Sequence, residues 1–148
     1  PMESIFPDEI RDLREQGVAF GELSCMADRR AELTRFLPLF LRVCRYLCQF
    51  ARSKGCERLV IAVHPKHGRF YERFFGFRKL AETRAYQSVL NKPATAYWLD
   101  FAWLSADHQE QFFGQEIPSN ELQPRPMSAE EAEHFGALAA SVNEIAVL

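Results

Sequence analysis

An amphipathic helix pattern between two short apolar segments is the feature that most constrains the fold. From Phe36 to Lys54, apolar residues recur at spacings of three and four, while arginines and Gln49 take the opposite face. This pattern predicts a helix that ends at Gly55. The segments Val18–Met26 and Leu59–Val63 on either side are short and apolar and predict buried strands. Because one crossover helix joins them, the two strands are expected to be parallel.

The elements further along the chain predict a mixed sheet. A second helix is expected from about Lys66 to Phe75, ended by Gly76. Two strand patterns follow, Arg78–Gln87 and Ala94–Leu104, and the turn signal of residues 91–93 (Asn-Lys-Pro) between them predicts an antiparallel hairpin. Together with a short helix expected over Asp8–Glu15, these elements give an α/β fold class with an α+β mixed sheet.

The C-terminal part of the chain differs in composition. After Ser105 it is polar and interrupted by prolines until Ser128, where the run Ser-Ala-Glu-Glu is a capping-box pattern. A final helix is therefore expected, with Ala132, Phe135, Leu138 and Val142 on one side. The domain organisation that follows is a body over residues 1–104, then a polar linker and a C-terminal helix over residues 105–148.

Composition excludes several classes of protein. Lys and Arg total 18 against 20 Asp and Glu, so nothing indicates a nucleic-acid partner. No apolar run is long enough to span a bilayer, and a cytoplasmic location is the default expectation. The four cysteines, Cys25, Cys44, Cys48 and Cys56, lack the spacing of a metal site or a disulfide framework and are expected to be reduced, mostly buried thiols.

The segment His64–Phe77 carries a more specific signal. Its sequence, HPKHGRFYERFFGF, resembles the end of a strand and the following helix in the long-chain N-acyl amino acid synthase branch of the GNAT acyltransferases. The resemblance extends from about Gly17 to Phe101 and includes Gly21–Ser24, where that family carries a glutamate. It implies that the chain holds the C-terminal half of a GNAT fold.

The resemblance also implies where the chemistry takes place. In a GNAT fold the two parallel strands splay apart, and the pantetheine arm of an acyl thioester lies in the opening, here between Leu23–Asp28 and Leu59–His64. Glu22 would act as the base that takes a proton from the attacking amine, or it would simply pair with an arginine. His64 and His67 are alternatives as the base or as ligands of a substrate carboxylate. Tyr71 would protonate the departing thiolate, although core packing explains this residue at least as well.

The expected donor follows from a loop without glycine. The acetyl-CoA pattern of that fold places glycines between strand and helix, but Ala27–Thr34 has none, which favours a carrier protein's phosphopantetheine over the diphosphate of CoA. An acyl-phosphopantetheine thioester is thus the expected co-substrate, without a metal or a covalent cofactor. The residues predicted to bind it are Leu23, Ser24, Ala27, Asp28, Arg29, Arg30, Arg35 and His67. The arginines equally suit a solvated surface.

The expected activity is transfer of a medium or long acyl chain from an acyl carrier protein or CoA to the amine of an amino acid. Two alternatives remain open: a silent module that binds acyl thioesters, and an enzyme like the acyl-homoserine-lactone synthases. The strand Val18–Met26 has little chain before it, so its edge is expected to pair with a missing N-terminal half or with a second copy.

Overall fold

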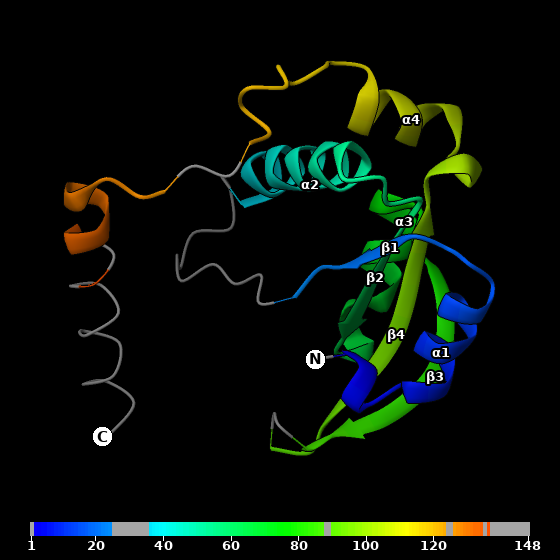
Figure 1. Cartoon of the computed structure of the whole chain (residues 1–148). Helices are drawn as coiled ribbons and strands as arrows, with labels where there is room; N and C mark the ends of the chain where they lie inside the picture. Colours follow the sequence, from blue (N-terminus) through cyan, green and yellow to red (C-terminus); the bar gives the residue numbers. More distant parts are fainter. Residues whose placement is uncertain (1, 25–35, 88–89, 124–125, 135, 137–148) are drawn as a thin grey trace. The chain divides into compact units, whose positions relative to one another are not determined.

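A four-stranded mixed sheet lies at the centre of the computed structural model, which describes residues 2–24, 36–87, 90–123, 126–134 and 136 (Figure 1). The strands are β1 (Phe20–Glu22), β2 (Arg58–Val63), β3 (Arg78–Tyr86) and β4 (Lys92–Asp100), in the spatial order β1-β2-β4-β3. The α-helices up to residue 118 of the described chain are α1 (Pro7–Glu15), α2 (Phe36–Ser53), α3 (Gly68–Phe75) and α4 (Ala106–Phe113). The predicted α/β class with a mixed sheet is confirmed.

The strand pairing follows the predicted topology. β1 and β2 are parallel, with Glu22 opposite Val60, and the crossover between them contains α2. β3 and β4 form the expected antiparallel hairpin. The spatial order of the strands was not predictable from the sequence pattern. β4 lies between β2 and β3, and it pairs with the full length of β2, from Arg58 opposite Asp100 to Val63 opposite Thr95.

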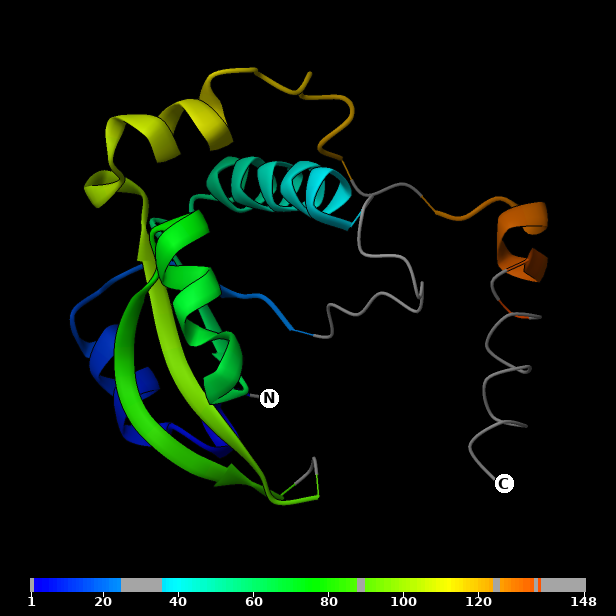
Figure 2. The same ribbon diagram turned by 180° about the vertical axis from the view of Figure 1, so that it is seen from behind.

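Each face of the sheet has its own core. On one face, here called the N-terminal face, the 3-10 turn η1 (Met2–Ser4) and α1 cover Val60 and Ala96. On the other, the helical face, α2, α3 and α4 pack over Leu59, Ile61, Tyr97 and Leu99 (Figures 1 and 2). Successive strand residues alternate between the two faces, which is why β2 is apolar almost throughout.

Several predicted boundaries are wrong. The strand expected over Val18–Met26 is confined to Phe20–Glu22, followed by Leu23 and Ser24 outside any strand, while Cys25 and Met26 lie outside the described residues. The strand expected over Ala94–Leu104 ends at Asp100, whose carboxylate accepts a hydrogen bond from the Ala102 N-H and starts a 3-10 turn. The Asp100 side chain thus ends the strand, although the residues that follow it are still apolar.

Helix α4 was missed because its sequence, ADHQEQFF, is polar except at its end. The buried Phe112 attaches it to the helical core, and Ser105 caps its first turn by accepting a hydrogen bond from the His108 N-H. Gln49, expected on the exposed face of α2, is buried instead. Its amide donates to the Phe112 and Gln115 carbonyls at 2.8 Å and accepts from the Ile117 N-H. The first compact unit therefore extends to Pro118, past the boundary expected at residue 104.

Residues 119–148 form a second unit. Its predicted helix start is confirmed, because the Ser128 hydroxyl accepts from the Glu131 N-H at 3.1 Å and the Glu131 carboxylate accepts from the Ser128 N-H at 2.8 Å. The helix includes residues 129–134. Phe135, Leu138 and Val142 lie outside the described residues.

Gly68 at the start of α3 provides a test of this packing. A Cβ there would lie 2.8 Å from the Cζ of Tyr97 and nearer still to its hydroxyl oxygen. We expect Gly68→Ala to lower the free energy of unfolding by about 1–3 kcal/mol, as overpacking does. Combining it with Tyr97→Phe, which removes the nearest atom, should recover part of that loss in a urea titration. Equal stability of Gly68→Ala and the parent would contradict the contact.

Candidate active site

The site begins where β1 and β2 part. Their ladder ends with Glu22 opposite Val60 and one further bond, donated by the Leu23 N-H to the Val60 carbonyl at 3.0 Å. β2 then continues to Val63, where its partner among the described residues is β4. In Figure 1, β1 turns away from the sheet at this point. Within the described residues, the ladder therefore ends where the resemblance predicts that the two parallel strands diverge.

Glu22 lies at this point of divergence and is half-buried. Its two carboxylate oxygens each lie 3.1 Å from the backbone nitrogen of Met2, whose N-H they accept. Because Met2 is fully buried on the N-terminal face, this bond fixes the carboxylate in place. The partner that the described residues provide is a main-chain amide, contributed by a turn that no sequence pattern predicted at this place.

The strand ladder determines which backbone groups are available at the opening. The Leu23 N-H already donates to the Val60 carbonyl, so this N-H is not available to a pantetheine amide. Ser24 is exposed. On β2, the peptide groups of Arg58 and Val60 point toward β1. Because every second residue of a strand directs its peptide groups to the same side, those of Ala62 also point this way, beyond the last bond of the ladder. The peptide of Ala62 is thus the group that a bound amide would meet.

His64 and His67 are exposed residues at the end of β2. The His64 Nδ1 accepts the Lys66 N-H at 3.2 Å and caps the 3-10 turn η3 (Pro65–His67), which gives His64 a structural role at this position. The two imidazole rings lie 6.3 Å apart. Partial burial, together with nearby Lys66 and His64, lowers the pKa of His67, so its imidazole is neutral at pH 7. A neutral ring keeps one nitrogen able to accept a proton.

Tyr71 faces inward from α3 and is half-buried among aromatic rings. The rings of Phe40, Phe70, Phe75 and Phe77 lie 5.6–6.3 Å from it. Burial, and to a lesser extent the neighbouring Cys44, raises its pKa, so the hydroxyl keeps its proton at neutral pH. Among the described residues no group hydrogen-bonds to this hydroxyl. The surroundings support the expected core packing of Tyr71 and still allow it to donate a proton.

Glu22 and Tyr71 lie on opposite faces of the sheet. Glu22 is paired with Val60, which belongs to the core of the N-terminal face, whereas Tyr71 packs in the core of the helical face. Leu23, next to Glu22, packs against the same helical core as Tyr71. A molecule placed between the diverging strands would therefore have the carboxylate on one side and the phenol on the other.

Other predicted residues divide into two groups. Ala27, Asp28, Arg29, Arg30 and Arg35 lie outside the described residues. The phenylalanines of the motif are mostly core: Phe75 and Phe77 are buried and Phe70 is half-buried, but Phe74 is 42% exposed. In the described part of the chain, no helix is both long and apolar enough to cross a bilayer.

Comparisons with known proteins gave both a family match and a structural match. Residues 1–100 match the protein family described as FeeM, N-acyl amino acid synthase FeeM. The structure is similar to that of FeeM, an N-acyl amino acid synthase from uncultured soil microbes, with a TM-score of 0.53 and 28% sequence identity. The match covers 68% of this chain and 57% of that one, so the chain spans less than two thirds of that protein. No curated protein sequence matches the chain.

Proposed function

Since the chain belongs to the FeeM family of N-acyl amino acid synthases, we propose that the protein containing it transfers an acyl group from a thioester to the amine of an amino acid. The observation that carries this proposal is the parting of β1 and β2 beside Glu22. It brings together a carboxylate and a part of the β2 backbone that pairs with no β1 residue among those described, and acyl transfer from a thioester uses both a base and hydrogen-bond donors.

The proposed reaction uses groups on both faces of the sheet. The amine nitrogen attacks the thioester carbonyl carbon, and Glu22 takes a proton from that nitrogen. The peptide N-H of Ala62 holds the thioester arm. The carbon-sulfur bond then breaks, and the thiolate receives a proton from the Tyr71 hydroxyl, whose raised pKa keeps it protonated until that step. The products are an N-acyl amino acid and a free thiol.

His67 is the second candidate for proton transfer, because its lowered pKa leaves a neutral imidazole at the end of β2. His64 is the weaker candidate, since its Nδ1 already caps η3. We also propose that Arg29, Arg30 and Arg35 meet the phosphate of the donor. The reaction would take place in the cytoplasm, a reducing compartment that keeps Cys44 and Cys48 as free thiols.

The donor in this proposal is a medium or long acyl chain on a carrier protein, because the glycine-free segment Ala27–Thr34 suits one phosphate better than a diphosphate. The test is to supply the full-length protein with a mixture of amino acids and one acyl chain, carried either by acyl carrier protein or by CoA. We expect N-acyl amino acids by mass spectrometry, with a higher kcat/KM for the carrier. Thioester binding without any acyl-amine product would refute the enzymatic proposal. A homoserine lactone product would instead favour an enzyme like the acyl-homoserine-lactone synthases.

A further inference from the structure

The outer surface of α2 and α3 carries basic side chains that have no partner. Arg42 on α2, Lys66 in η3, and Arg69 and Arg73 on α3 are all exposed, and within the described residues none forms an ion pair or stacks on a ring. Most other described basic residues are engaged. Some form ion pairs, Arg45 donates hydrogen bonds to α4, and others lie over aromatic rings.

Arg42 lies on α2, and Arg69 and Arg73 lie on α3, a helix that packs directly against α2 and follows the turn η3 with Lys66. Phe40 of α2 contacts Phe70 and Phe75 of α3, with ring centroids 5.9 and 5.4 Å apart. On the outside of the same two helices, Val43 is 40% exposed and Phe74 is 42% exposed. The result is a patch of exposed apolar side chains with basic residues around it, which we call the α2-α3 surface.

The composition of this patch is that of a protein interface. Exposed apolar groups favour contact with another surface, and arginines are enriched where proteins meet. Unpaired positive charges attract an acidic partner and speed its encounter. Glu72 is the acidic residue that α3 itself presents among them. Its single negative charge leaves the surface clearly positive.

The surface adjoins the candidate active site. η3 and α3 begin directly after β2, beyond the point where β1 parts from it, and α3 carries Tyr71 on its inner side. A protein held on the outside of α3 would therefore stand next to the place where its thioester has to enter.

We infer that the α2-α3 surface docks the acyl donor, a carrier protein with an acidic surface around its phosphopantetheine arm. The residues assigned to the interface are Arg42, Val43, Lys66, Arg69, Arg73 and Phe74. This inference rests on the proposed function and extends it, because it says how the donor is recognised. Docking would be governed by charge and would weaken as salt screens it.

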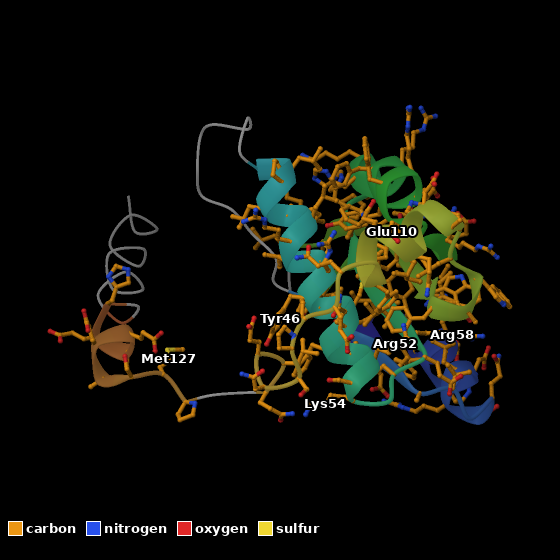
Figure 3. The ribbon with its side chains drawn as sticks, turned by 90° about the horizontal axis from the view of Figure 1, so that it is seen from above. Tyr46, Arg52, Lys54, Arg58, Glu110 and Met127 are labelled. Carbon is orange, nitrogen blue, oxygen red and sulfur yellow. The ribbon has the colours of Figure 1, made fainter. Side chains whose placement is uncertain are left out.

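The test uses the full-length protein and measures the Kd of the holo form of an acyl carrier protein by fluorescence anisotropy. The double variant Arg69→Glu/Arg73→Glu should raise that Kd at least about tenfold, because like charges would then face each other. The matched control is Arg52→Glu/Lys54→Glu, with the same change of charge. Both control residues are exposed and lie near the C-terminal end of α2, away from the contact with α3 (Figure 3). This control should leave the Kd within about twofold of wild type.

Kinetics with two donors separate this inference from the proposed function. With the same acyl chain, the double variant should raise KM for the carrier thioester and leave kcat/KM for acyl-CoA or acyl-pantetheine unchanged. Absence of product from every donor would refute the proposed function while the binding measurement still tests the surface. Unchanged carrier affinity in the double variant would overturn the inference. The inference would also be overturned if the double variant lost binding to phosphatidylglycerol vesicles but not to the carrier protein, because the surface would then face a membrane.

Discussion

Replacing Glu22 by glutamine is expected to lower kcat of the full-length enzyme at least about tenfold, since general-base catalysis typically contributes about 10²- to 10⁴-fold. The physical reason is that the attacking amine nitrogen must give up a proton as its bond to the carbonyl carbon forms, and a glutamine side chain cannot take that proton. Glutamine keeps the size of the side chain and one oxygen that can accept the Met2 N-H, so the turn η1 should stay in place.

The measurement is the pH profile of kcat together with a thermal unfolding curve. Glu57→Gln is the matched control, because Glu57 is exposed and lies directly before β2 at the opposite end of the strand from the site. Its kcat should equal that of wild type. A Glu22→Gln enzyme that is as active as wild type at every pH would remove Glu22 from the mechanism. A large drop in melting temperature would show that the carboxylate serves mainly to hold η1.

The second large effect concerns Phe112. Phe112→Ala should lower the free energy of unfolding by about 3–5 kcal/mol, the cost of deleting a fully buried phenyl ring. The side chain is 0% exposed, its ring is stacked 6.1 Å from that of Phe75, and it joins α4 to the core of the helical face. The change would also loosen the segment whose carbonyls accept from Gln49.

Chemical denaturation followed by circular dichroism measures this cost, with Phe74→Ala as the control. Phe74 is the same residue type on the neighbouring helix but is 42% exposed, so its truncation should cost about 1 kcal/mol or less. If Phe112→Ala were no more destabilising than Phe74→Ala, α4 would not be part of the folded core, and the first unit would end near the predicted residue 104.

The sequence alone was sufficient for the local elements and for the direction of the strands. The 3.6-residue pattern of α2, the apolar run of β2 and the glycines at Gly55 and Gly76 each act within a few neighbouring residues. Both glycines have the positive φ angles, 81° and 72°, that end helices. The capping box at Ser128 is equally local, and its two reciprocal hydrogen bonds are confirmed. The parallel pairing of β1 and β2 followed from the chirality and length of a crossover.

The tertiary structure decided what depends on partners distant in the chain. No pattern in the sequence places β4 beside β2. Alternation of side chains determines which face of the sheet each residue belongs to, but it does not determine which strand is the neighbour. α4 forms through one buried ring and a glutamine more than 60 residues away, as the 2.8 Å bonds of Gln49 show. The same holds at the site. The sequence pointed to Glu22, but only the fold brings the Met2 amide to its carboxylate and puts Tyr71 on the other face of the sheet, since both relations are made by packing across the core.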